Sequence, residues 1–299
     1  MIEPIVVLIT GCSSGFGRAA AEVLAKKGFR VYAGMRETVG RNADAASELR
    51  GFNSENRFLR VVDLDVSSDA SVEAAVRQTL QEAGKIDVLV NNAGLFMVGP
   101  MEAFTLEQWK MAFETNLFGA VRMDRAVLPS MRRDGNGLLI HISSVAGRLA
   151  SPVDGVYCAS KHALGMVAEV YRYELAPFGV DSVLIEPFVY PTAIFGKALK
   201  PADESRSAEY VSFGNIEKRR LGFFDAALRA PGIGDPSELG EKIAELIRLP
   251  IGKRPLHNVL PASMQERLNP LDSFMEKAQL RSMEMSGFTD LLEQRARVT

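Results

Sequence analysis

The stretch Thr10-Gly11-Cys12-Ser13-Ser14-Gly15-Phe16-Gly17 decides the fold prediction. It follows an apolar run, Ile5 to Thr10, and leads directly into an amphipathic segment, Gly17 to Lys27. Glycine lets the backbone turn tightly, and the first amides of a helix attract negative charge. A glycine cluster alone is often only a loop, but its place between a first strand and a first helix predicts a loop that binds the pyrophosphate of a dinucleotide.

Short apolar runs and amphipathic stretches alternate through most of the chain. The runs predicted as strands are Ile5 to Thr10, Arg30 to Ala33, Leu59 to Asp63, Val88 to Val90, Leu138 to Ile142 and Ser182 to Ile185. The stretches predicted as helices are Gly17 to Lys27, Ala70 to Ala83, Leu106 to Met131 and Tyr157 to Phe178. Apolar strands separated by helices suit a parallel sheet covered on both faces. We expect an α/β, doubly wound Rossmann fold with a central parallel sheet flanked by helices.

The regular alternation stops after Pro187. Residues 188–230 mix aromatic, small and charged residues and are predicted to form an irregular substrate lid, after which Asp235-Pro236 opens another helix. The domain is expected to span residues 1–260. Residues 261–299 are predicted to form a C-terminal helical extension that packs on the lid, joins a subunit interface or is partly disordered.

Composition excludes several classes of function. The chain has 299 residues, 47% of them apolar, and a net charge of −2, which favours a small-molecule partner over nucleic acid or an anionic membrane surface. Its two cysteines and three histidines form no metal-spaced cluster, so no metal is expected, and few cysteines favour a reduced, cytoplasmic location. The apolar run near the start is too short to span a membrane, and no other span is predicted.

Tyr157 and Lys161 lie one helical turn apart, thirteen residues beyond Ser144. An ammonium group near a phenol favours the phenolate, so Tyr157 is predicted to exchange a proton near neutral pH. An alcohol that loses hydride must also lose its hydroxyl proton, and a ketone that gains hydride must gain one. The pair therefore indicates hydride transfer, with Ser144 holding the same oxygen by a hydrogen bond.

The end of the second predicted strand bears on cofactor choice. Met35 stands where an acid that binds the adenosine ribose would be expected, and Arg36 follows it. A guanidinium there can pair with a ribose 2′-phosphate, so NADP(H) is preferred, with NAD(H) as the alternative. The competing interpretation is that Arg36 is solvated or partly neutralised by Glu37.

Together these residues resemble the short-chain dehydrogenase/reductase family over at least Ile5 to Thr192, with likeness to hydroxysteroid and retinol dehydrogenases and bacterial carbonyl reductases. The resemblance implies that Tyr157 is the general acid/base, that Ser144 rather than Ser143 polarises the substrate oxygen, and that Lys161 binds the nicotinamide ribose and lowers the pKa of the tyrosine. Asn116 would support a water-linked proton path. The implied cofactor residues are Gly11, Ser13, Ser14, Gly15, Phe16, Gly17, Arg36, Asp65, Val66, Asn92, Ala93, Gly94, Tyr157, Lys161, Pro187 and Thr192. A homodimer or homotetramer built through the helices that carry Asn116 and Tyr157 is also implied.

One position departs from the family pattern. The family usually has Pro-Gly after the sixth strand, whereas Pro187 is followed here by Phe188. Glycine allows a closer approach to the cofactor than a residue with a Cβ. Phe188 is predicted either to form part of the substrate wall or to pack under the lid.

The predicted substrate site is mostly apolar. Its residues are Ser144, Val145, Tyr157, Phe188, Phe96 and Phe195, with Met97, Leu149, Val153, Tyr190 and Ile194 as further candidates, each of which can also be ordinary core. The expected substrate is a hydrophobic alcohol or ketone, and the lid lysines and arginines are expected to be solvated rather than to bind an anion. His141 is expected in the core. A catalytically silent NADP(H)-sensing protein on the same fold is the alternative function.

Overall fold

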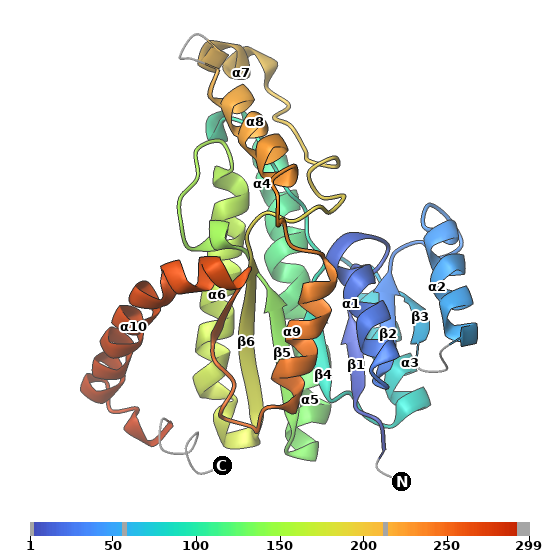
Figure 1. Ribbon diagram of the computed structural model, residues 1–299. Helices are drawn as coiled ribbons and strands as arrows, with labels where there is room; N and C mark the ends of the chain where they lie inside the picture. Colours follow the sequence, from blue (N-terminus) through green and yellow to red (C-terminus); the bar gives the residue numbers. More distant parts are fainter. Residues whose placement is uncertain (1–2, 56–58, 212–214, 292–299) are drawn as a thin grey trace.

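Seven parallel strands form the centre of the computed structural model, which describes residues 3–55, 59–211 and 215–291 (Figure 1). Their order in the sheet is β3-β2-β1-β4-β5-β6-β7. The chain leaves β1 in one direction to build β2 and β3 and then crosses to β4, so the order reverses between β1 and β4. This confirms the doubly wound parallel sheet. The strands are β1 Val6–Ile9, β2 Arg30–Met35, β3 Leu59–Asp63, β4 Val88–Asn91, β5 Gly137–Ile142, β6 Val180–Pro187 and β7 His257–Leu260.

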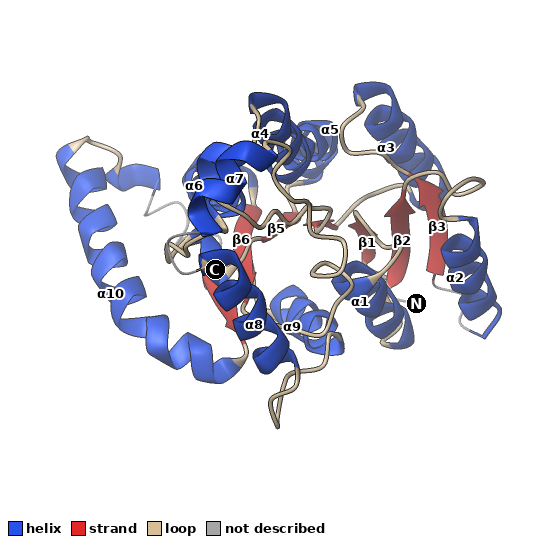
Figure 2. Cartoon of the chain, turned by 90° about the horizontal axis from the view of Figure 1, so that it is seen from above, coloured by secondary structure: helices blue, strands red, loops and turns tan. Residues whose placement is uncertain are grey.

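Helices cover both faces of the sheet (Figure 2). One face carries α1 Gly15–Lys26, α2 Ala43–Glu55 and α9 Ser237–Arg248; the other carries α3 Asp69–Ala83, α4 Leu106–Phe113, α5 Gly119–Asp134 and α6 Gly155–Glu174. Side chains of a strand alternate between faces. In β1, Val7 and Ile9 therefore pack toward α1 and α9, while Val6 and Leu8 pack toward α3 and α5. None of the helices within the described ranges combines the length and the apolar character needed to cross a bilayer.

Two elements of the sheet layers were not predicted, and one predicted helix is interrupted. The unpredicted elements are α2 and the edge strand β7, whose polar His257 and Asn258 lack the apolar pattern of the inner strands. The stretch predicted as one helix from Leu106 to Met131 contains a π-helical segment, Glu114–Phe118, between α4 and α5. The helix predicted at Asp235-Pro236 begins at Ser237, whose amide donates to the Asp235 carboxylate at 2.8 Å.

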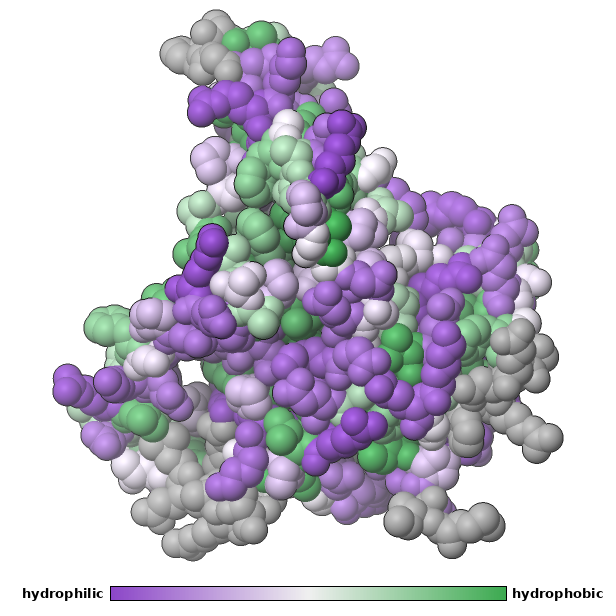
Figure 3. Space-filling view, viewed as in Figure 1, coloured by the Kyte–Doolittle hydropathy of each residue, from purple (hydrophilic) through white to green (hydrophobic). Residues whose placement is uncertain are grey.

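Residues 188–230 project above the carboxyl ends of the strands (Figure 1). The prediction of an irregular segment is wrong in part, because it contains α7 Glu204–Val211 and α8 Ile216–Leu228, with residues 212–214 outside the described residues. Both helices expose apolar side chains, including Val211 and Phe223, and hydrophobic surface is visible on this projection (Figure 3). Their low burial explains why the amphipathic pattern was weak there.

The C-terminal helix α10, Ala262–Met285, follows β7 directly and extends away from the sheet (Figure 1). Near its start, Leu268 packs against Val145 and Val259. Arg148, which follows the turn after β5, forms an ion pair with Asp272 of the same helix. The first turns of α10 are thus attached to the loop that carries Ser144. Residues 292–299 of the predicted extension lie outside the described residues.

Candidate functional site

Two adjoining cavities open at the carboxyl end of the sheet. The first has a volume of about 620 Å³ and gathers most of the predicted cofactor residues: Gly11, Ser13, Ser14, Gly15, Phe16, Arg36, Asp65, Val66, Asn92, Ala93, Gly94 and Thr192. Gly17 and Pro187 do not line it. Gly17 is buried under the loop, and Pro187 lines the second cavity with Tyr157 and Lys161. Residues such as Asn92, Gly94 and Thr192 border both cavities, so the two cavities adjoin.

The glycine loop fits closely against the end of β4. Gly11 has a φ of +74°, and a Cβ there would lie 2.9 Å from the Ala93 Cα. A Cβ on Gly17 would lie 2.4 Å from the Asn92 amide nitrogen and 2.5 Å from the Gly11 carbonyl oxygen. The Thr10 hydroxyl accepts hydrogen bonds from the backbone amides of Asn92 (3.0 Å) and Ala93 (2.9 Å). This cradle, at the start of α1, suits the phosphates of a dinucleotide.

The far end of the same cavity carries positive charge. Arg36 and Arg41 both line it. Burial alone would raise the pKa of Asp65, but hydrogen bonds from Ser67 and the charge of Arg36 lower it overall. The Glu37 carboxylate lies 3.9 Å from Arg41, and its side chain is largely exposed. Two guanidinium groups thus line the same cavity as Asp65.

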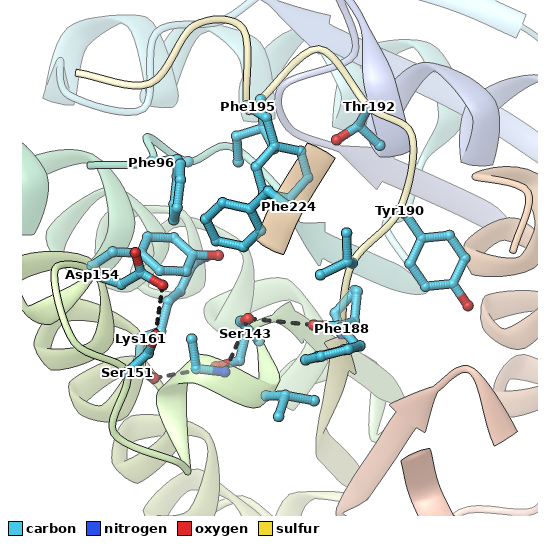
Figure 4. A pocket seen from close by; sticks show the side chains of 18 of the residues that line it. Phe96, Ser143, Ser151, Asp154, Lys161, Phe188, Tyr190, Thr192, Phe195 and Phe224 are labelled. Carbon is cyan, nitrogen blue, oxygen red and sulfur yellow. Dashed lines mark hydrogen bonds between the residues drawn. The ribbon is translucent and has the colours of Figure 1, made fainter. Parts of the chain in front are cut away.

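Ser144, Tyr157 and Lys161 all line the second cavity, in which Figure 4 labels Lys161. Ser144 ends the extended segment after β5, and its hydroxyl accepts from the Ala146 amide at 3.1 Å and donates to the Pro187 carbonyl at 3.3 Å. The Lys161 ammonium donates to the Ile142 carbonyl at 2.7 Å and lies 5.9 Å from the centre of the Tyr157 ring. Ser143 instead donates to the Lys161 carbonyl at 3.2 Å.

Asn116 lies in the π-helical segment and is buried. Its side-chain oxygen accepts from the Leu95 amide at 2.7 Å, and its nitrogen donates to the Leu95 carbonyl at 3.0 Å and the Ser160 hydroxyl at 2.9 Å. A π-bulge shifts the helix by one residue and often occurs at functional sites. Here it directs Asn116 toward the loop after β4, where a Cβ on Gly94 would lie 3.3 Å from the Asn116 oxygen and 3.5 Å from the Lys161 nitrogen.

Burial controls the proton affinities of Tyr157 and Lys161. Desolvation raises the pKa of Tyr157, with Cys158 and Asp154 adding to the effect, while a hydrogen bond with Ser144 acts in the opposite direction. Desolvation also lowers the pKa of Lys161 to about 8. The expected lowering of the tyrosine pKa by Lys161 is therefore not found in this structure. The physical reason is that burial penalises the charged phenolate, while the Lys161 ammonium is held by the Ile142 carbonyl.

The second cavity has a volume of about 370 Å³ and is largely apolar. All six predicted substrate residues line it, as do Leu149, Tyr190 and Ile194. Phe96 contacts the Tyr157 ring edge-on at 5.0 Å between centroids. Phe188 lines the cavity and also packs against Phe223 of α8 at 6.2 Å, so both of its predicted roles describe its position. Its φ is not positive, so the backbone accommodates the side chain without strain.

Two positions predicted for the substrate site lie elsewhere. Met97 and Val153 are buried in neighbouring apolar clusters and do not line the cavity. His141 is fully buried as expected, but its Nε2 has no hydrogen-bond partner among the described residues, and burial lowers its pKa to about 3. No group of three potential metal ligands occurs within the described ranges.

The sequence did not single out several residues of the cavities. Arg41, Asn42 and Lys197 line the first cavity, and the Lys197 ammonium reaches the Ser14 hydroxyl at 3.2 Å. Asp154 and Arg220 line the second and form an ion pair. Lys197 and Arg220 belong to a segment whose charges were expected to be solvated, so only the tertiary contacts reveal them.

Comparison with known proteins agrees with this arrangement. Residues 5–202 match the family described as short chain dehydrogenase. A Bacillus subtilis protein named an uncharacterized oxidoreductase is 34% identical over 261 residues, which cover 83% of this chain and 89% of that protein. Human 17-beta-hydroxysteroid dehydrogenase type 1 is 42% identical over 204 residues, covering 67% of this chain but only 61% of the human protein.

Solved structures share the complete architecture. A short-chain dehydrogenase from Streptomyces avermitilis has a TM-score of 0.74 and 31% identity, with 95% of this chain and 98% of that chain covered. An alcohol dehydrogenase from Thermococcus sibiricus, complexed with 5-hydroxy-NADP, has a TM-score of 0.69 and 26% identity, covering 86% and 96%. A Burkholderia phymatum member in complex with NAD has a TM-score of 0.73 and 26% identity, covering 92% and 95%. Neighbours of this chain thus bind both forms of nicotinamide dinucleotide.

Proposed function

The chain belongs to the short-chain dehydrogenase/reductase family, and on that premise we propose that it is an NADP(H)-dependent oxidoreductase that transfers hydride between nicotinamide and a hydroxyl or carbonyl carbon. The observation that carries the proposal is that Ser144, Tyr157 and Lys161 line an apolar cavity that shares Asn92 and Gly94 with the cavity around the glycine loop. A reacting carbon placed there has proton-transfer groups on one side and room for its apolar body on the other.

The residues of the chain would handle the proton and the substrate oxygen. When bound, NADP(H) supplies or accepts the hydride. The raised pKa keeps Tyr157 neutral, and a neutral phenol is the form that gives its proton to a carbonyl oxygen as that carbon is reduced. Ser144 would hold the same oxygen by a hydrogen bond. Lys161 would bind the nicotinamide ribose, and Asn116, fixed by its bonds to Leu95, would support a water-linked proton path.

The preference for NADP(H) over NAD(H) is supported by Arg36 and Arg41 in the cofactor cavity. A phosphate dianion pairs well with two guanidinium groups, whereas an unphosphorylated ribose gains little from them. Met35, which ends β2, supplies no carboxylate for a ribose diol. The charge of this end of the cavity thus favours the phosphorylated cofactor.

The proposed substrate is a largely hydrophobic alcohol or ketone. The cavity is enclosed by aromatic side chains from the loop after β4, from the segment after β6 and from α8, including Phe96, Phe195 and Phe224. Residues 188–230 would act as the lid that covers the substrate, because Phe223 and Phe224 of α8 line the cavity together with Asp154, which precedes α6. Phe224 and Asp154 are labelled in Figure 4.

A homodimer or homotetramer is supported by apolar side chains exposed on α4, on the π segment and on α6. Leu106 is 71% exposed, Phe118 51% and Met166 52%. A second copy would remove these side chains from water. Light scattering on the purified protein tests this proposal, and a strictly monomeric mass would contradict it. A cytoplasmic location remains a prediction; it is supported by Cys12 and Cys158, which are both free thiols.

The function is tested by following nicotinamide absorbance with NADPH, and separately NADH, against hydrophobic ketones, quinones, steroids and retinoids. The wild-type protein should oxidise NADPH with one of these, and Tyr157→Phe should reduce kcat by at least about a hundredfold. Turnover of Tyr157→Phe at near the wild-type rate would refute the acid/base role. Tight NADPH binding with no turnover across the panel would instead favour the NADP(H)-sensing alternative.

A further inference from the structure

Two oppositely charged side chains lie together in the wall of the mostly apolar cavity. Asp154 directly precedes α6 and is 1% exposed, and Arg220 belongs to α8. The Arg220 Nε donates to the Asp154 Oδ2 at 2.8 Å, and the Nη2 of the same guanidinium donates to that oxygen as well. The Ser151 hydroxyl also donates to it, at 2.9 Å (Figure 4). One carboxylate oxygen of Asp154 thus connects the start of α6 to α8.

The ion pair is continuous with the aromatic side chains over Tyr157. The Arg220 guanidinium carbon lies 4.2 Å from the centre of the Phe224 ring and 5.0 Å from that of Phe223. Phe224 packs against Phe96 at 5.6 Å between centroids, and Phe96 packs edge-on against Tyr157 at 5.0 Å. Displacing Arg220 would therefore displace the rings that bound the substrate site.

The pair also changes the charge beside the tyrosine. Asp154 is three residues before Tyr157, on the same side of the first turn of α6, and its negative charge opposes formation of the phenolate. Arg220 compensates that charge. A buried carboxylate without its partner is costly, so the pair is expected to persist while α8 is in place. The other groups that act on the phenol are Ser144, from the loop after β5, and Cys158 and Lys161, from α6.

We propose that Asp154 and Arg220 are a positioning pair for the reaction. Their ion pair docks α8 on the start of α6 and fixes the aromatic side chains that lie over Tyr157. It also compensates the charge of Asp154 beside this proton-transferring tyrosine. This inference rests on the proposed oxidoreductase function. Because the two charges compensate each other, the site is suited to a neutral, apolar substrate. A structural tie alone would hold α8 but would not alter the ionisation of Tyr157.

Two variants separate docking from charge: Arg220→Met, and the double variant in which Asp154→Asn is added to it. Arg220→Met keeps the length of the side chain but removes its charge, so KM for an apolar ketone should rise about tenfold, which corresponds to about 1.4 kcal/mol, with a smaller change in kcat. Arg219→Met is the matched control, because Arg219 is the exposed neighbour on the same helix, and its KM should equal that of the wild type. Unchanged KM in Arg220→Met would overturn the docking role.

The charge effect is measured by a titration that needs no turnover, so its result does not depend on whether a substrate has been found. Tyrosinate absorbance is titrated for each variant and for the same variant carrying Tyr157→Phe, and the difference reports Tyr157 alone. In Arg220→Met, Tyr157 should ionise at higher pH than in the wild type, because Asp154 is left uncompensated. Asp154→Asn added to Arg220→Met should reverse that shift while KM stays raised. The charge role would be overturned if the ionisation pH of Tyr157 did not shift in Arg220→Met, or if adding Asp154→Asn left that shift in place. Thermal unfolding verifies that each variant is folded.

Discussion

Replacing Arg36 by alanine should weaken NADPH binding selectively. Arg36 follows the last residue of β2 and lines the cofactor cavity. Burial raises the pKa of Asp65, but the Ser67 hydrogen bonds and the charge of nearby Arg36 lower it overall. The Arg36 side chain is exposed to solvent in the structure. The 2′-phosphate is the only group that distinguishes NADPH from NADH, so an interaction made only with that phosphate should appear in one affinity and not in the other.

The magnitude follows from the kind of contact. A hydrogen bond to a charged group contributes about 1.5–3 kcal/mol, which corresponds to a loss of roughly 10- to 150-fold in Kd. Arg41 lines the same cavity and would keep part of the attraction. Solvent also screens the exposed guanidinium. We therefore expect the Kd for NADPH to rise about 10- to 30-fold in Arg36→Ala, and the Kd for NADH to change less than about twofold.

The assay is titration of NADPH and NADH fluorescence at one fixed salt concentration. Arg50→Ala, on the exposed side of α2 and outside the cavity lining, is the matched control and should leave both affinities unchanged. Raising the salt concentration should weaken NADPH binding more in the wild type than in Arg36→Ala, because the variant lacks the contact between Arg36 and the phosphate that salt screens. An equal loss for both cofactors, or no loss for either, would refute the assignment of Arg36 to the 2′-phosphate.

Three further substitutions test the packing around the site. Burial raises the pKa of Asp124 from 3.8 to about 8, although the hydrogen bond from Asn91 lowers it. The protonated Asp124 therefore contributes its full stabilisation below about pH 4, and this stabilisation is lost as the pH rises through 8. Asp124→Asn should raise the melting temperature more at pH 8 than at about pH 5, and a difference that does not change with pH would contradict this. Gly17→Ala should cost about 1–3 kcal/mol of unfolding free energy and weaken NADPH binding, because its Cβ would meet the Gly11 carbonyl at 2.5 Å; Gly165→Ala, in open space on α6, should cost nothing in the same urea titration. Leu268→Ala should cost about 2–5 kcal/mol and raise KM through Val145, whereas Leu271→Ala, 37% exposed on the same helix, should do neither.

The fold was predictable because its signals are local. Strands such as Leu138 to Ile142 are short apolar runs, and each lies between amphipathic stretches of sequence. Alternation of this kind leaves few topologies other than a parallel sheet covered by helices. The glycine loop then specifies one end of that sheet, because only a residue without a side chain fits at Gly11 and Gly17. Periodicity and steric exclusion are properties of neighbouring residues, so one sequence suffices to reveal them.

The elements that sequence reasoning missed depend on contacts between distant residues. β7 is a strand because β6 offers it a hydrogen-bonding edge, not because His257 and Asn258 favour extended backbone. The π-helical segment at Asn116 interrupts a stretch whose amphipathic pattern reads as one uninterrupted helix. Helices α7 and α8 hold few buried side chains, with Phe224 buried in α8, so they lack the buried apolar face of the helices that cover the sheet.

The sequence by itself thus determined the sheet, the cradle for a dinucleotide and the spacing of Ser144, Tyr157 and Lys161. The tertiary structure decided how these groups behave. It buries Tyr157 so that desolvation raises its pKa, where sequence spacing predicted a lower one. It also brings Arg220 to Asp154 across 66 residues of chain. Spacing along a helix fixes which side chains are neighbours, but the dielectric around them and the partners that reach them from other elements exist only once the chain has folded.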